Sequence, residues 1–125
     1  MEIVQVAQHA DDLNRAAAFY EALLGAPPAA RFEGQGLLFF NVGISRLLLE
    51  KAARSALIYL QVDDVRVSID ELHARGVEII DAPHVIFSHT DDTLGPAGTD
   101  EWMAFIRDSE GNTVGLISHE PRHDP

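Results

Sequence analysis

The sequence contains no cysteine among its 125 residues. Disulfide bonds, thiolate metal ligands and a cysteine nucleophile are therefore all excluded. Basic residues are also scarce, because nine Lys and Arg stand against 20 Asp and Glu and leave a formal net charge of −11. A surface of that sign repels nucleic-acid phosphates and anionic lipid headgroups. We therefore expect neither nucleic acid nor a membrane as a partner, and neutral or cationic small molecules fit better.

Long apolar runs are missing as well. No run approaches the roughly 20 residues that a membrane-crossing helix needs, and Met1-Glu2-Ile3 leads straight into a strand-like stretch without a basic, apolar leader. We therefore expect a cytoplasmic protein. Phosphate-binding glycine loops, nucleophile elbows and dinucleotide fingerprints are equally absent from the sequence. With 46% hydrophobic and 23% charged residues, the chain is expected to form a single globular domain over residues 1–125.

The first half of the chain reads as strand, helix and three further strands. Asp11 and Asp12 offer carboxylates that can cap the start of a helix, and Gly25 stands where that helix should end. The apolar stripe of this helix consists of Leu13, Ala17, Tyr20 and Leu24. The predicted strands are Ile3–Gln8, Ala30–Glu33, Leu37–Val42 and Arg46–Lys51.

The same pattern restarts in the second half. Asp63 and Asp64 provide the cap, Gly76 provides the stop, and Asp64 lies 52 positions after Asp12. The helical stripe consists of Val65, Ile69 and Leu72. The predicted strands are Ala56–Val62, Val77–Ile80, His84–His89, Glu101–Arg107 and Thr113–Ser118, with a loop insertion at Thr90–Thr99 and a tight turn at Asp108–Asn112.

These two halves predict an α+β fold built from two tandem βαβββ modules, at about residues 1–52 and 55–120. One such module leaves a face of its curled mixed sheet uncovered, so two modules are expected to pair. The pairing would form a concave cleft lined by alternate residues of the strands, and we expect a ligand to bind there.

Several short motifs in this order resemble the vicinal oxygen chelate superfamily. They are Asp12-Leu13, Phe19-Tyr20-Glu21, Leu23-Leu24-Gly25, Val62-Asp63-Asp64-Val65 and Arg107-Asp108-Ser109-Glu110-Gly111-Asn112. The superfamily includes glyoxalase I, methylmalonyl-CoA epimerase, bleomycin-resistance proteins and extradiol dioxygenases. Within it, Pro83-His84-Val85-Ile86 and Trp102-Met103-Ala104-Phe105 look like a bacterial branch of small proteins without the metal ligands.

The resemblance implies four positions for metal ligands, one on each of four cleft strands. In this sequence they fall at Gln5, Leu48, Leu57 and Gly115. Only Gln5 carries a side-chain donor atom, whereas a divalent cation needs several nitrogen or oxygen ligands. We therefore expect no metal and no other cofactor.

An alternative interpretation retains a divalent metal site. Glu50 lies two residues beyond Leu48 and shares its strand face, so a register slip of two would make Gln5 and Glu50 two ligands of a divalent ion. The protein would then be a metal-dependent lyase or isomerase of the glyoxalase I or epimerase type, which removes a proton next to a carbonyl. A weaker alternative is metal-free acid–base catalysis by Glu50 and His84. We assign no catalytic residue.

Strand alternation and residue chemistry together suggest which side chains bind the ligand. These candidates are Gln5, Arg46, Glu50, Tyr59, His84 and Trp102. Arg46 and Glu50 can instead satisfy each other at a sheet edge, and His84 can be a rim residue bonded to backbone. Trp102 can stack on a flat ligand or a cation, or it can pack in the core or a dimer interface.

The remaining polar residues have simpler interpretations. His89, His119 and His123 are expected in solvent-exposed loops or the tail, and His73 on the polar side of the second helix. The acidic residues around Pro96, which are Asp91, Asp92, Asp100 and Glu101, are expected to be solvated. Gln8 should face the helix from a buried position, where it would need a hydrogen bond to a neighbouring strand or a partner chain.

Two functions follow from these observations. The first is metal-free binding or sequestration of a small organic ligand, flat or cationic, by a homodimer of the bleomycin-resistance type. The acidic surface would raise the local concentration of cations. The second is the lyase or isomerase described above.

Overall fold

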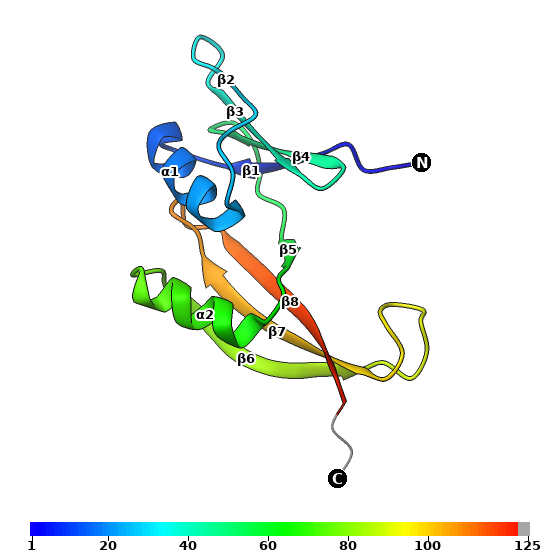
Figure 1. Cartoon of the computed structure of the whole chain (residues 1–125). Helices are drawn as coiled ribbons and strands as arrows, with labels where there is room; N and C mark the ends of the chain where they lie inside the picture. Colours follow the sequence, from blue (N-terminus) through cyan, green and yellow to red (C-terminus); the bar gives the residue numbers. More distant parts are fainter. Residues whose placement is uncertain (123–125) are drawn as a thin grey trace. The chain divides into compact units, whose positions relative to one another are not determined.

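The computed structural model describes residues 1–122 and shows two helices and eight strands over that range (Figure 1). The strands form two four-stranded mixed sheets. The order of elements is β-α-β-β-β, repeated once along the chain. The structure thus confirms the α+β fold and the tandem βαβββ modules, while His123 lies outside the described residues.

The first module contains β1 (Gln5–His9), α1 (Leu13–Leu24), β2 (Ala30–Phe32), β3 (Leu37–Val42) and β4 (Ser45–Glu50). Its sheet has the order β1-β4-β3-β2, in which β1 and β4 run parallel and the other pairs run antiparallel. Sheet residues Leu38, Phe40, Leu47 and Leu49 are buried together with Ala16 and Tyr20 of α1. The core of this module therefore lies between α1 and one face of its sheet.

The ends of α1 follow the sequence signals. The Asp12 carboxylate accepts a hydrogen bond from the Arg15 N–H at 3.0 Å, and Gly25 adopts a left-handed φ of 74° that ends the helix. Tyr20 of the predicted apolar stripe is fully buried, as expected. The buried alanine is Ala16, however, and not the predicted Ala17, which is partly exposed.

The second module contains β5 (Ile58–Gln61), α2 (Val65–Ala74), β6 (Ile79–Ser88), β7 (Thr99–Arg107) and β8 (Thr113–Pro121). Its sheet has the corresponding order β5-β8-β7-β6, with β5 and β8 parallel. Asp64 caps α2 by accepting hydrogen bonds from two backbone N–H groups. The core again lies on the helix side, where Val65, Ile69 and Leu72 are buried with Ala104, Ile106, Val114 and Leu116.

The edge strand of the second sheet differs from the sequence prediction. Val77–Ile80 and His84–His89 were predicted as two strands, but the structure has a single strand, β6, across Pro83. Its pairing with β7 shifts register between Ile79 and Asp81, between Asp81 and His84, and again further on. These irregularities and the edge position of β6 accommodate a residue that cannot donate a backbone hydrogen bond.

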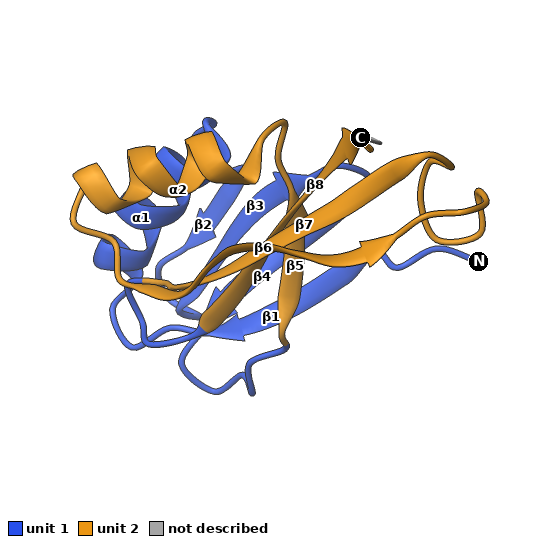
Figure 2. Cartoon of the chain, turned by 90° about the horizontal axis from the view of Figure 1, so that it is seen from below, with its two compact units in different colours: residues 1–56, 109–112 blue, residues 57–108, 113–125 orange. Residues whose placement is uncertain are grey.

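The chain forms two compact units that largely follow the modules (Figure 2). The first comprises residues 1–56 and 109–112, and the second comprises residues 57–108 and the chain from 113 onward. Glu110 belongs to the first unit. Its carboxylate accepts hydrogen bonds from the backbone N–H groups of Asp11 and Asp12 and from the Arg15 guanidinium. Among residues 1–122, no helix is long and apolar enough to cross a membrane.

Candidate functional site

The sheet face of the second module that points away from α2 carries a row of side chains around Gly115. Tyr59 pairs with Gly115 in β8, and Gly115 pairs with Phe105 in β7. The Tyr59 and Phe105 rings pack edge to face, with their centroids 5.9 Å apart. A Cβ on Gly115 would lie 2.6 Å from the Tyr59 ring. The Tyr59 ring can therefore lie over the sheet at this point because position 115 has no side chain.

A hollow of about 600 Å³ opens on this face. One part of its lining is apolar or aromatic, and the other part is polar and ionisable. The lining residues are Tyr59, Gln61, Ile86, Phe87, His89, Leu94, Glu101, Ile117 and His119. We refer to this hollow as the second-module pocket.

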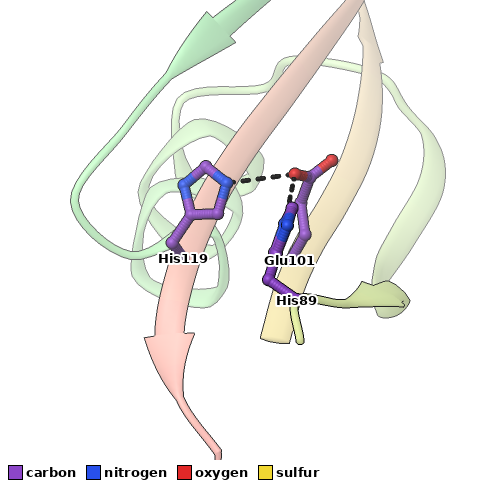
Figure 3. A group of neighbouring side chains, drawn as sticks. All are labelled: His89, Glu101 and His119. Carbon is purple, nitrogen blue, oxygen red and sulfur yellow. Dashed lines mark hydrogen bonds and ion pairs between the residues drawn. The ribbon is translucent and has the colours of Figure 1, made fainter. Parts of the chain in front are cut away.

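Three of its residues form a cluster, which we call the His-Glu-His cluster. The Nε2 atoms of His89 and His119 each lie 3.0 Å from Oε1 of Glu101, and Figure 3 shows both rings turned toward that carboxylate. The His89 residue is only 2% exposed, and the other two are half-buried. The prediction that His89 and His119 are solvent-exposed is therefore wrong, as is the prediction that Glu101 is simply solvated.

The β6–β7 hairpin positions this cluster. The backbone N–H of His89 donates to the Thr99 carbonyl, and the N–H of Gly98 donates to the His89 carbonyl, both at 2.8 Å. Glu101 in β7 lies directly opposite His119 in β8. Facing residues on paired strands hold their Cβ atoms about 5 Å apart, so the sheet itself brings the carboxylate to the second imidazole.

The connecting loop, residues 89–98, packs closely against the imidazoles. A Cβ on Gly95 would lie 2.8 Å from the His89 ring and 2.9 Å from the His119 ring. Within the loop, hydrogen bonds from Thr93 hold the pKa of Asp91 below its ordinary value, and the neighbouring His89 adds to that effect. The loop therefore keeps a negative charge beside the cluster.

The six sequence-predicted ligand residues are spread over both modules, and only Tyr59 lines the second-module pocket. Trp102 points to the opposite face of β7, where the Arg66 guanidinium lies 4.6 Å from its ring centroid. His84 is exposed on the edge strand β6, with Nδ1 2.9 Å from the Ala82 carbonyl oxygen. Within the second module, the structure does not bring these three residues together.

The other three candidates belong to the first module. Arg46 donates through Nε to the Gln5 Oε1 atom at 2.7 Å, and its guanidinium lies 5.7 Å from the Phe39 ring centroid. Glu50 pairs with His9, whereas Arg46 pairs with Gln5 at the other end of the same two strands. Four residues of strand separate these pairs by about 13 Å. Gln5 and Glu50 are therefore poorly placed to share one metal ion, which weakens the alternative metal site.

Comparison with known proteins decides the family. A family model for the glyoxalase/bleomycin resistance protein/dioxygenase superfamily matches residues 2–116. The chain belongs to this superfamily. The match confirms the resemblance that the sequence motifs indicated. No curated protein sequence matches the chain significantly.

Solved structures of the superfamily fold cover nearly the whole chain. A lactoylglutathione lyase from Agrobacterium tumefaciens is 25% identical over 94% of this chain and 92% of its own, with a TM-score of 0.69. TnmS3, an antibiotic binding protein from Streptomyces sp. CB03234, is 21% identical over 96% and 97%, with a TM-score of 0.73. A glyoxalase/bleomycin resistance protein/dioxygenase from Alicyclobacillus acidocaldarius is 17% identical over 94% and 91%, with a TM-score of 0.65. The last two likenesses show the fold alone.

The positions that the superfamily resemblance assigned to metal ligands carry no set of donor atoms in the structure. Leu48 is buried in β4, Leu57 is exposed just before β5, and Gly115 lies under the Tyr59 ring. None of these three offers a side-chain nitrogen or oxygen, and Gln5 already accepts a hydrogen bond from Arg46. The His-Glu-His cluster stands at other positions of the superfamily fold.

A signal for part of this cluster was present in the sequence. The turn at Asp108–Asn112 was predicted, and Arg107 pairs with Thr113 across it. Counting outward from that pair in an antiparallel hairpin brings Glu101 opposite His119. His89 has no comparable signal, because β6 pairs with β7 through register shifts that the sequence does not announce.

Proposed function

We propose that this protein binds a small organic molecule in the second-module pocket and does not use the four-ligand metal site of its superfamily. The observation that carries the proposal is the pocket itself, a hollow of about 600 Å³ with an apolar part and a polar part. That volume falls within the roughly 300–1,000 Å³ of pockets that bind small molecules. Such pockets combine apolar walls with a few polar groups that orient the ligand.

The lining suggests the chemistry of the ligand. Tyr59 and Phe87 are about half exposed, and Leu94 is 76% exposed, so apolar surface is available to cover a flat molecule. Glu101 and the chain's net charge of −11 favour a cationic group or hydrogen-bond donors at the polar end. A flat, partly apolar molecule with such a group is the expected ligand. The antibiotic-binding description of TnmS3 agrees with this class of function.

The proposal includes a homodimer, the assembly that the family resemblance implies. A dimer would have twice the chain mass of 13.7 kDa. Sedimentation equilibrium of the full chain tests this part separately. A monomer at micromolar concentration would contradict it without affecting the ligand proposal.

A fluorescence titration with proflavine, a flat cationic dye, tests the binding proposal. The protein is kept in excess chelator so that metal ions play no part. We expect saturable binding that is weakened in Tyr59→Ala and unchanged in Phe32→Ala, a matched control because Phe32 is an equally exposed aromatic of the first module. A ligand at 100 times its Kd should also raise the unfolding free energy by about 2.7 kcal/mol. Binding that Tyr59→Ala leaves unchanged would contradict the assignment to this pocket.

A metal-dependent lyase or isomerase is the second candidate. It is supported by the 25% identity with the lactoylglutathione lyase. Assay of lactoylglutathione turnover after addition of Ni²⁺ or Zn²⁺ distinguishes it from a binding protein. Turnover that depends on the added ion would favour the enzyme.

A further inference from the structure

We propose that His89, Glu101 and His119 bind one divalent first-row transition-metal ion, such as Zn²⁺, in the wall of the second-module pocket. This site is separate from the four positions that the superfamily resemblance assigned to metal ligands. It goes beyond the proposed function, because it rests on these three side chains and not on the organic ligand.

The donor set suits such an ion. Two imidazole nitrogens and one carboxylate oxygen are ligands that Zn²⁺ and Fe²⁺ use in proteins, whereas Mg²⁺ and Ca²⁺ prefer oxygen alone. The chain supplies all three donors within one sheet and its hairpin loop. No thiolate competes for the ion, because the sequence contains no cysteine.

The distances also fit. The three candidate ligand atoms all lie within 4.8 Å of one another, and both imidazole Nε2 atoms lie 3.0 Å from the same Glu101 oxygen. An ion bound at about 2.0–2.2 Å from each donor requires donors roughly 3.0–3.5 Å apart. Both rings are already turned toward the same Glu101 oxygen (Figure 3). Small side-chain adjustments are therefore enough to place an ion between them.

The surrounding structure holds the ligands in place before any ion binds. His89 is fixed by two backbone hydrogen bonds across the base of the loop, and Glu101 faces His119 on the neighbouring strand. Gly95 lies so close to both rings that any side chain there would press on them. A preorganised set of ligands loses little conformational entropy on binding, which favours affinity.

Nearby acidic side chains are engaged elsewhere and are not needed as ligands. The Asp91 carboxylate accepts the Thr93 N–H at 3.1 Å, and the Asp92 carboxylate accepts the Ala97 N–H at 2.8 Å. Asp100 accepts the Ser88 hydroxyl at 2.6 Å. These carboxylates add negative charge that attracts a cation, while the three-residue set supplies the coordination.

Three protein ligands leave at least one coordination position open. All three donors belong to residues that line the second-module pocket, together with Gln61 and Tyr59. Closed structural zinc sites use four protein ligands, whereas sites with three keep a position for water or a bound molecule. An ion here would therefore present its open position to whatever occupies the pocket.

Isothermal titration of Zn²⁺ into the untagged, chelator-treated full chain tests this site, with Co²⁺ absorption as a second readout of the ligands. We expect one ion per chain. His119→Gln, His89→Gln and Glu101→Gln should each weaken binding by roughly 100-fold or more, since even changes to residues behind the ligands cost 10–100-fold. His73→Gln is the matched control, because His73 is an exposed histidine on α2.

Circular dichroism of each metal-free variant shows whether it is folded. Because three separate ligand variants are made, the test remains valid if one of them does not fold. Loss of tight binding in the folded ligand variants, with His73→Gln unchanged, supports the site. Absence of one-to-one binding to the parent chain, or binding that all three folded ligand variants retain, overturns it. Neither result depends on proflavine binding, which is measured in chelator.

Discussion

The two modules share one plan, yet the pocket and the His-Glu-His cluster belong to the second. Both modules begin their helices at an aspartate cap and pair their first and last strands in parallel. Their hairpins differ, because β2 and β3 have three and six residues whereas β6 and β7 have ten and nine. The longer hairpin and its loop carry His89, Leu94 and Glu101. Extra strand length on a repeated scaffold thus supplies the site.

The parallel strand pairs of the two modules differ in the same sense. In the first module, Arg46 reaches across to Gln5, and the pair occupies the sheet surface. In the second, Gly115 has no side chain and Tyr59 lies over it. One face is occupied by a polar pair, and the other exposes an aromatic ring beside a hollow.

The largest expected effect contrasts a core phenylalanine with a pocket phenylalanine. Phe40 in β3 is 1% exposed, whereas Phe87 in β6 is 49% exposed. Phe40→Ala should lower the unfolding free energy by about 3–5 kcal/mol, because it removes buried apolar surface and leaves a cavity. Phe87→Ala should cost less than about 1 kcal/mol. Urea denaturation measures both, and equal losses would mean that Phe87 is a core residue.

The next effect contrasts two ion pairs, one at the start of each helix. Arg15 pairs with Glu110 at 2.7 Å, and Arg66 pairs with Glu120 at 2.6 Å. The Glu110 side chain is fully buried, whereas that of Glu120 is partly exposed. Glu110→Gln should cost about 2 kcal/mol, since a buried charge-assisted network is lost, and Glu120→Gln at most about 0.5 kcal/mol. Similar losses in urea denaturation would contradict this difference.

The same glutamate should make stability depend on pH. Burial alone would raise the pKa of Glu110, but hydrogen bonds from Arg15, Asp12 and Ser109 lower it to about 2. A carboxyl whose folded pKa lies below its unfolded value of 4.5 stabilises the fold above pH 4.5, and this contribution is lost as the pH falls toward 2. Stability measured between these values should fall less steeply in Glu110→Gln. An unchanged slope would count against the low pKa.

The smallest effect contrasts two buried polar side chains on the helix-facing sides of the sheets. The Ser118 hydroxyl accepts the Val65 N–H at 3.0 Å, whereas within residues 1–122 neither amide atom of Gln8 has a hydrogen-bond partner. Gln8→Leu should therefore raise stability by about 1 kcal/mol, and Ser118→Ala should lower it by a similar amount. Thermal denaturation checks the opposite signs. Two changes of the same sign would contradict this interpretation.

Local signals made the scaffold predictable from the sequence. The caps at Asp12 and Asp64 and the stop at Gly25 depend on neighbouring residues, so they can be read from a few letters. The separation of Val77–Ile80 from His84–His89 is wrong because proline is tolerated on an irregular edge strand, and edge position is a property of the whole sheet.

The candidate site was less predictable, because it depends on pairing between distant strands. Tyr59 was placed on the inner face by alternation alone, and it does line the pocket. Trp102 was a ligand candidate, with packing in the core or a dimer interface as its alternative. Counting outward from the β7–β8 turn puts it beside Ser118 on the helix side. The His89 contact depends on the shifted register of β6 and on the loop at Gly95, which no short motif encodes.

The location of the binding site in the second module is tested most directly by a two-dimensional ¹⁵N NMR titration of the full chain with proflavine in chelator. We expect the largest shift changes at Tyr59, Ile117 and His119, with small changes in β1 and β4. Changes concentrated around Gln5 and Arg46, with the second-module pocket unaffected, would contradict the claim that the second module carries the binding site.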